Sequence, residues 1–376
     1  MSIFLQTGAI KHFRARLIKC AGWSFILFVL LPLNLKAQEK VDSIQSQHTL
    51  IPLIFYLPET SLGIGGTGIS TFQDLRHHPK TRPSQILYSA VYTFKNQLLL
   101  FIPFEFYGNA NNSRIKGELG YYRYFYNFHG IGPESSKNDL ESYSVNFPRI
   151  EVNYSHRVFS NFYLGAGMNF DQFAIQKIEE GGILQSLKPI GYQGGRKANF
   201  VALAFFDTRD TLFAPSHGHY FEMKFQGSLP HWISDFQYYR LDLDYRHYQK
   251  LSAKMLLASN LFWSWASSNT PFFDLPYIST PNRGRGFDDR RFMNYDLINL
   301  QSELRFPIYK RFRGAGFLSI SDLAHESFQY FQNKLEWSYG MGIRYQLRND
   351  SKARLRLDLA KSRDSFNIYF TLNEAF

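Results

Sequence analysis

The sequence predicts an all-β protein, a transmembrane antiparallel β-barrel with 16 strands as the expected number, after a cleaved signal peptide. Polar and apolar residues alternate along many short segments, which is the period of a β-strand. Aromatic residues make up 18% of the chain, as expected where strands meet lipid and rings gather at the membrane interfaces. Short connections alternate with long ones, which is typical of a barrel with turns on one rim and loops on the other. A soluble, aromatic-rich β-sandwich is the alternative that composition alone allows.

Residues 1–37 have the pattern of a secretory signal peptide. A positive region (Lys11, Arg14, Arg16 and Lys19) precedes the apolar segment Ala21–Leu33, whose 13 residues are fewer than an ordinary membrane helix needs. Leu35-Lys36-Ala37 then resembles a cleavage site, so the mature chain is expected to begin at Gln38. An uncleaved membrane anchor is the alternative for this segment. We therefore expect a signal peptide at 1–37, a short periplasmic lead at 38–50 and an outer-membrane barrel at 51–376.

Charge and cysteine content exclude several classes of protein. Five of the 42 basic residues and none of the 31 acidic ones lie in the signal, so the mature chain carries a formal charge of +6 rather than +11. The remaining basic residues are spread among carboxylates, which argues against a nucleic-acid partner. The single cysteine, Cys20, leaves with the signal, so neither disulfide nor thiol chemistry is expected in the mature chain. No motif for a cofactor is present.

The alternation separates charged from apolar residues. In 149–155 the residues Arg149, Glu151 and Asn153 face one way while Ile150 and Val152 face the other. Segments 240–246 and 354–358 show the same division, with Arg354, Arg356 and Asp358 on one face of the latter. Charged inner faces and apolar outer faces fit a wet lumen and a lipid-facing wall. A soluble antiparallel sheet would give the same period with the faces inverted.

Fifteen strands follow from these patterns, and a first one at His48–Tyr56 gives the even number expected of a bacterial barrel. The fifteen are expected near 62–71, 85–93, 97–107, 113–126, 143–157, 161–174, 196–207, 218–228, 236–250, 253–265, 298–308, 315–322, 336–347, 353–360 and 365–373. The long connections are 127–142, 175–195, 267–297 and 323–335, and if Phe376 ends in the periplasm they lie on the external rim. Glycines at 63, 65, 66 and 68 make an early strand deformable, which predicts a bend or a weak seam.

The connection 267–297 contains the sequence's most suggestive group of charges. Arg285 lies between Gly284 and Gly286, with Phe287 next, and the following strand carries Glu303 on its polar face. A loop arginine that folds inward toward Glu303 and Asp322 would form charge-assisted hydrogen bonds there. We refer to this hypothesis as the loop lock. Its alternative is a surface arginine in a flexible loop.

These residues are similar to the Omp85 superfamily, also described as bacterial surface antigens or BamA/TamA-like barrels. The superfamily's Val-Arg-Gly-Phe/Tyr loop signature corresponds to Gly284-Arg285-Gly286-Phe287, with Gly in place of Val. Its Glu-x-Arg strand pattern corresponds to Glu303 and Arg305. Its (Phe/Gly)-x-Asp-x-Gly motif corresponds to 320–324, in which only Asp322 is kept.

The resemblance implies a 16-stranded barrel whose sixth external loop is tucked inside, with Arg285 in contact with Glu303 and Asp322. It also implies that the terminal Phe376 belongs to the signal by which outer-membrane assembly machinery recognises a barrel. Superfamily insertases and secretion pores carry periplasmic POTRA domains, and we expect none here. Client capture would then require a separate periplasmic partner.

The segment from Asp207 to Gly218 is the other motif that the resemblance covers. Asp207, Asp210, Pro215 and Gly218 look like the superfamily's Asp-rich turn before a mid-barrel strand. An acid pair or a metal site is one interpretation of the aspartates. The simpler one is that they accept hydrogen bonds within their own turn. We predict no metal site, because His77 and His78 also lack the spacing of metal ligands.

The predicted function is outer-membrane protein assembly and insertion or polypeptide translocation, and no catalytic residue is expected. A structural or passive-diffusion barrel without POTRA domains is the first alternative. A rim hydrolase is the second, since histidines at 129, 156, 217, 219 and 247 are available. The expected partners are outer-membrane lipid, the assembly machinery and the periplasmic partner.

Overall fold

The computed structural model describes residues 44–57, 61–74, 81–133, 135–136, 139–211, 214–280, 282–325, 329–331, 334–346 and 354–376. The predicted signal peptide and the first part of the predicted lead, up to residue 43, lie outside the described residues.

Sixteen strands form one antiparallel sheet in which each strand pairs with its neighbours in the sequence. The predicted fold class and strand number are therefore confirmed. The strands are β1 (Ile44–Leu57), β2 (Ser61–Asp74), β3 (Ser84–Thr93), β4 (Leu98–Gly108), β5 (Ser113–Phe128), β6 (Glu141–Phe159), β7 (Phe162–Lys177), β8 (Gly194–Asp207), β9 (Gly218–Ser228), β10 (Tyr239–Lys250), β11 (Leu256–Ala266), β12 (Asp296–Tyr309), β13 (Phe312–Ala324), β14 (Glu336–Gln346), β15 (Arg354–Ser362) and β16 (Phe366–Leu372).

The first strand begins earlier than the sequence pattern indicated. β1 starts at Ile44, inside the expected lead of 38–50 and before the expected His48, and it pairs with β2 from Ile44↔Asp74 to Leu57↔Ser61. Gln45, Ser46 and Gln47 lack the polar–apolar alternation that indicates a strand, so the pattern did not predict this start.

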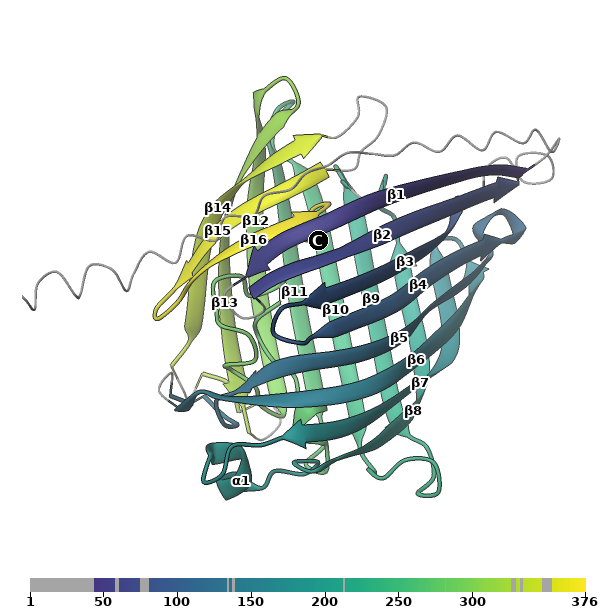
Figure 1. Cartoon of the computed structure of the whole chain (residues 1–376). Coiled ribbons are helices and arrows are strands. Elements are labelled where there is room, and N and C mark those ends of the chain that lie inside the picture. Colours follow the sequence, from purple (N-terminus) through teal and green to yellow (C-terminus); the bar gives the residue numbers. More distant parts are fainter. Residues whose placement is uncertain are drawn as a thin grey trace, which may run out of the picture.

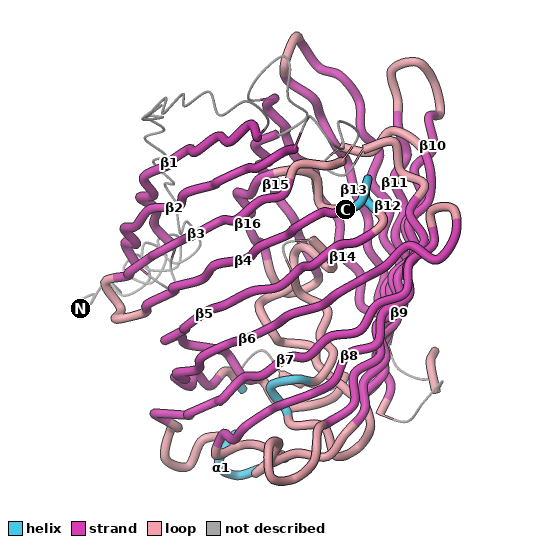
Figure 2. The backbone as a smooth tube through the Cα atoms, turned by 90° about the vertical axis from the view of Figure 1, so that its right-hand side faces the viewer, coloured by secondary structure: helices cyan, strands magenta, loops and turns pink. Residues whose placement is uncertain are grey.

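The sheet curls round a central space, with β1 to β8 on the near side, β9 to β11 behind them and β14 to β16 at the left (Figure 1). Long connections after β5, β7, β9, β11 and β13 lie on one rim, which also carries α1 (Ile183–Leu187), while the other rim has mostly shorter turns. One of those turns includes η1 (Asn109–Asn111), and the connection after β11 includes η3 (Phe272–Asp274). Loop segments occupy the interior of the curved sheet toward the α1 rim (Figure 2).

No helix in the described part of the chain is long and apolar enough to cross a membrane.

The two faces of the sheet differ as the alternation predicted. On β14, Ser338 and Arg344 point inward and are buried, whereas outward residues are exposed, with Met341 at 68%. On β12, Asn299, Gln301, Glu303 and Arg305 are all buried in the lumen, and Leu300 is exposed on the outside. The inner face is thus polar and the outer face apolar, which is the arrangement of a lipid-embedded barrel.

The sheet has two edges, β1 and β16. The strand order runs from β1 to β16, and within the described residues no hydrogen-bonded ladder joins these two strands. β16 is short, with 7 residues against 14 in β1. Pro52 lies in β1, and an edge strand tolerates proline because its missing backbone N–H need not interrupt a ladder there.

The outward position of Met341 gives a direct test of which face meets lipid. We expect Met341→Arg to destabilise the barrel in lipid vesicles by roughly 2–4 kcal/mol, because a lipid-facing cation near the middle of a strand is costly in hydrocarbon. Urea unfolding in vesicles measures the change, with Met341→Leu as the matched control. Equal stability of the two variants would contradict a lipid-facing β14.

Candidate functional site

The connection between β11 and β12, residues 267–295, folds into the lumen. Near its start, the backbone N–H of Phe272 donates to the carbonyl of Ile190 at 2.9 Å. Near its end, the carbonyl of Met293 accepts a hydrogen bond from the N–H of Gly132 at 2.8 Å. Phe272 packs edge-on against Phe128, with ring centroids 5.4 Å apart. The segment, which we call the inward loop, is therefore held by the β5–β6 and β7–β8 connections and by the end of β5.

The tip of the inward loop contains the two glycines of the predicted motif. Gly284 has φ +58° and Gly286 φ +108°, in the region that favours glycine. A Cβ on Gly284 would lie 2.4 Å from Cγ2 of Ile278, and one on Gly286 would lie 3.0 Å from the carbonyl carbon of Lys361. The Gly286 N–H also donates to the Tyr369 hydroxyl at 2.9 Å. Glycine at position 284 therefore has a local reason, because the backbone turns tightly against Ile278.

Arg285 extends from this tip into a group of buried carboxylates. One terminal nitrogen lies 2.8 Å from Oε2 of Glu303 on β12, and the other lies 2.5 Å from Oδ2 of Asp358 on β15. The guanidinium also lies over the Phe317 ring, 3.5 Å from its centroid. The three charged side chains are 1%, 0% and 0% exposed. Removing one partner of such a buried pair costs about 3–5 kcal/mol, so the contacts constrain the loop strongly.

Further arginines surround the same carboxylates. Arg344 on β14 contacts Glu303 at 3.1 Å and Asp358 at 2.5 Å. Arg305 contacts Glu303 at 2.8 Å. Glu374 lies 3.6 Å from Arg305 and 3.2 Å from Arg344. The loop arginine thus completes a lumen cluster that joins β12, β14, β15 and the chain end. We call it the lumen charge cluster.

Asp322 is not part of this cluster, which corrects the expected contact with Arg285. It accepts hydrogen bonds from the backbone N–H groups of Leu323, at 2.8 Å, and Phe331, at 2.6 Å. Its position on β13 has the parity of Leu318, which is 50% exposed on the outer face. The Asp322 side chain therefore leaves β13 on the outer face of the sheet rather than on the lumen face. The connection after β13 covers it through Phe331. Asp358 takes the expected place, and its alternation with Arg354 and Arg356 was the signal for it.

The turn before β9 uses both of its aspartates internally. Asp207 accepts from the N–H and the guanidinium of Arg209, at 3.1 and 2.9 Å. Asp210 accepts from the N–H and the hydroxyl of Ser216, both at 2.8 Å. Although burial raises the pKa of Asp210, the Ser216 hydrogen bonds outweigh it and lower that pKa.

The remaining motif residues complete the same turn. Pro215 immediately precedes Ser216, and Gly218 has φ +106°, where a Cβ would lie 2.4 Å from the carbonyl oxygen of Thr208. The described geometry of Asp207, Asp210, Pro215 and Gly218 is that of a hydrogen-bonded turn. No group of three or more His, Cys, Asp or Glu residues that could hold a metal ion occurs in the described parts of the chain.

Phe376 lies beyond the last strand. β16 ends at Leu372, and Phe376 turns into a buried cluster with Tyr248 and Leu256. Its backbone oxygen accepts a hydrogen bond from Arg305 at 2.9 Å. The observed strand thus ends within the expected range of 365–373. The final residue does not extend the strand and contacts the lumen charge cluster instead. The role of Phe376 as an assembly signal stays a prediction.

A second charged group lies in the lumen where the inward loop meets β8 and β10. Asp274 is 3.1 Å from the Lys197 ammonium and accepts a hydrogen bond from the Tyr238 hydroxyl at 2.6 Å. Burial raises the pKa of Asp274, but the charges of Lys197 and Arg240 outweigh it and lower that pKa to about 2. Asp274 is therefore ionised at neutral pH and ties the loop to the wall.

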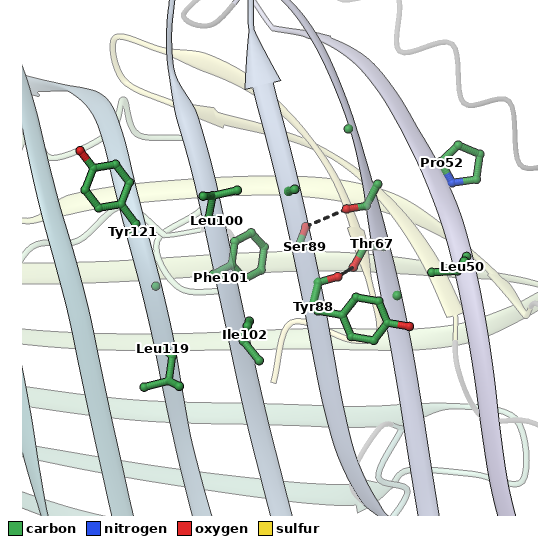
Figure 3. Close-up of a pocket in the computed structure, with 15 residues that line it drawn as sticks. Leu50, Pro52, Thr67, Tyr88, Ser89, Leu100, Phe101, Ile102, Leu119 and Tyr121 are labelled. Carbon is green, nitrogen blue, oxygen red and sulfur yellow. Dashed lines mark hydrogen bonds between the residues drawn. The ribbon is translucent and has the colours of Figure 1, made fainter.

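The outer face of β1 to β5 has an apolar hollow of about 690 Å³. Its lining includes Gly66, Gly68 and Ala90. Leu100 and Tyr121 line it as well (Figure 3). Small residues on neighbouring strands remove the side chains that would otherwise fill the space. In a lipid-facing wall such a hollow is filled by hydrocarbon chains, so we assign it no specific ligand.

A sixteen-stranded barrel with a polar lumen and an inward loop anchored by a buried arginine defines a class of outer-membrane barrel. Within that class the chain belongs to a known family: residues 85–376 match the Omp85 superfamily domain. A comparison with curated protein sequences finds no match.

Solved structures of outer-membrane barrels are similar to the chain, among them BamA and CdiB. BamA from Haemophilus ducreyi lacking POTRA domains 1–3 matches with a TM-score of 0.55 and 15% identity, over 98% of this chain and 78% of that one. CdiB from Escherichia coli matches with a TM-score of 0.62 and 9% identity, over 92% of this chain and 67% of that one. At these identities the likeness supports the barrel fold.

The replacement of Asp322 by Asp358 can be tested with double-mutant cycles. We expect Arg285→Ala and Asp358→Asn to be coupled by about 0.5–3 kcal/mol in unfolding free energy, because the two side chains are in contact. Arg285→Ala and Asp322→Asn should add within about 0.5 kcal/mol. Urea unfolding in vesicles measures both cycles, with the heat-resistant folded band on a gel as a check. Coupling to Asp322 without coupling to Asp358 would refute the observed pairing.

The lowered pKa of Asp274 predicts a pH-dependent contribution to stability. Its ordinary pKa is 3.8 and its folded pKa is about 2, so the stabilisation is fully present above about pH 4 and is lost toward pH 2. Asp274→Asn should therefore lower the unfolding midpoint at pH 6, and the difference from wild type should vanish near the folded pKa. Denaturant titrations across that range measure it. A difference as large at the lowest pH as at pH 6 would rule out this ionisation.

Proposed function

We propose that this barrel works in the assembly and insertion of outer-membrane proteins or in the translocation of polypeptides. Membership of the Omp85 superfamily supports a role of this kind. The observation that carries it is the seam between β1 and β16, the first and last strands of the sheet order, beside the glycine-rich β2.

An unpaired strand edge is a template for another strand. When such an edge opens, its N–H and C=O groups can pair with an incoming segment, and strand addition of this kind supplies affinity without requiring one sequence. The neighbouring β2 is rich in glycine, and Leu50 and Pro52 of β1 pair with Gly68 and Gly66 there. Glycine weakens a strand interior, so the β1–β2 ribbon can deform more easily than the rest of the wall.

The lumen charge cluster makes the two sides of this seam unequal. Arg285 joins the inward loop to β12 and β15, and Gly286 reaches Tyr369 on β16. The C-terminal side of the seam is therefore braced from within the lumen. We propose that opening occurs by movement of the β1–β2 side against this braced side.

The inward loop also bears on the passive-diffusion alternative. Its Phe272 packs against Phe128 at the end of β5, and the loop fills part of the lumen. A passive pore would need the loop to leave, which would break the buried contacts of Arg285. Steady conductance in planar bilayers with the loop in place would favour this alternative.

The proposal includes a cellular setting. Residues 1–37 direct export, the C-terminal segment ending at Phe376 directs the barrel's own insertion by assembly machinery, and a separate periplasmic partner delivers clients. Crosslinking in cells from the rim opposite α1 would capture that partner.

The edge hypothesis predicts a position-specific contact with clients. A photoreactive residue in place of Leu50 on β1 should crosslink to newly made outer-membrane proteins, because its strand edge receives them. Leu300 on β12 is exposed on the outer face in the same way and serves as the control. Depletion of the protein should lower the amounts of other barrels several-fold. Equal crosslinking at both positions, with unchanged barrel levels, would contradict the proposal.

A further inference from the structure

A cavity of about 330 Å³ lies between the inward loop and the lumen wall. It is in the half of the lumen nearer the α1 rim, bounded by side chains of β5, β6, β7, β8, β10 and β11 and by the loop. Its size is at the small end of the range of about 300–1,000 Å³ that is usual for ligand sites. Its basic lining residues are Arg149, Lys197, Arg240, Arg283 and Arg290.

The three basic residues of the wall are paired with carboxylates. Arg149 and Lys197 contact Asp171 at 2.8 and 2.9 Å. Lys197 also contacts Asp274 at 3.1 Å, and Arg240 approaches the same carboxylate at 3.7 Å. These cations are compensated by the protein itself, so they do not by themselves call for a ligand.

Arg283 of the inward loop is different. Its guanidinium lies on the Phe262 ring, 3.3 Å from the centroid. It makes no ion pair within 4.0 Å to any carboxylate among the described residues, and its side chain forms no hydrogen bond there. The carboxylates whose charges act most on Arg283 are those of Asp244 and Asp242. Both are paired with other arginines: Asp242 lies 3.0 Å from Arg240, and Asp244 lies 2.5 Å from Arg246. Burial lowers the pKa of Arg283, as expected for a cation without a close counter-ion.

Arg290 is a second loop cation without an ion pair among the described residues. Only 9% of it is exposed, and its guanidinium lies 4.2 Å from the centroid of the Tyr126 ring and 5.0 Å from that of Tyr277. One nitrogen donates to the carbonyl of Phe273 at 3.3 Å, while the buried Nε has no acceptor. Its φ of +54° is unusual for a residue with a side chain, and such strain persists where the surroundings impose it.

We infer that this cavity binds a small organic anion, with a carboxylate or phosphate group between Arg283 and Arg290 and a flat apolar part among the rings. Guanidinium groups match both kinds of anion by paired hydrogen bonds, which are strong where water is scarce. Stacked rings of Phe173 and Phe273, with centroids 4.1 Å apart, provide the apolar surface beside them.

A bound anion would also act on the loop. Arg283 and Arg290 belong to the inward loop, whereas Phe173 and Lys197 belong to the wall. A ligand that contacts both sides binds only while the loop is inside, so it stabilises that position by mass action. This consequence does not depend on the proposed role in protein assembly.

The test uses the full-length protein in lipid nanodiscs and calorimetric titration with phenyl phosphate and benzoate. Phenol, which has the ring without the charge, is the ligand control. We expect at least one anion to bind and phenol not to bind. Arg283→Gln and Arg290→Gln should each weaken binding by about tenfold or more, because each removes a charged hydrogen-bond donor. Arg196→Gln is the matched control, since Arg196 pairs with Asp235 at 2.7 Å on the exposed rim.

A second measurement needs only the wild-type protein. Phenylglyoxal labels accessible arginines, and mass spectrometry locates the label. The anion that binds should protect Arg283 from labelling and leave Arg196 unprotected. Absence of binding at millimolar anion, equal affinity in all three variants, or equal labelling of Arg283 with and without anion would each overturn the inference. Preference for phenyl phosphate or for benzoate assigns the anion class.

Discussion

The structure depends on one buried arrangement: the guanidinium of Arg285 between Glu303 and Asp358, with almost no exposed surface on any of the three. A cation in that position without carboxylates would be very costly, and so would the carboxylates without cations. The arrangement is satisfied only when the tip of the inward loop lies deep in the lumen. Gly284 and Gly286 permit the backbone to turn there. A few side chains therefore determine where a loop of nearly thirty residues lies.

This constraint divides the barrel into unequal parts. The lumen charge cluster connects the loop with β12, β14 and β15, and a second group around Asp274 and Lys197 connects it with β8. Neither group includes β1 or β2, which carry proline and glycine instead of buried charge pairs. A braced C-terminal side and a deformable N-terminal side follow from where the charged residues occur in the sequence. The same loop encloses the cavity that holds Arg283 and Arg290.

The sequence predicted the wall better than the contacts inside it. Alternation placed Glu303 and Arg305 in the lumen because a strand's period of two fixes the face of each residue. The same rule argued against Asp322, which shares the outward parity of Leu318, and it favoured Asp358. The expectation of Asp322 rested on its charge, whereas the alternation of a strand decides which face a side chain occupies.

Other features depend on long-range packing that no local pattern encodes. Phe376 turns inward because Arg305 and Tyr248, more than a hundred residues away in the latter case, offer it partners. The cavity beside Arg283 exists because the loop lies against side chains of six strands of the wall. Its arginines are ordinary loop residues in the sequence, and only the folded positions of the surrounding carboxylates show that, among the described residues, neither arginine has an ion pair within 4.0 Å.

The central claim, that buried charge holds the loop tip inside the lumen, is tested most directly by hydrogen exchange. Backbone exchange of residues 282–287 in lipid nanodiscs should be as slow as in the neighbouring strands, because Gly286 donates to Tyr369 within a closed interior. Exchange as fast as in the exposed loop around Gly181 would show that the tip is not held, and would contradict this account.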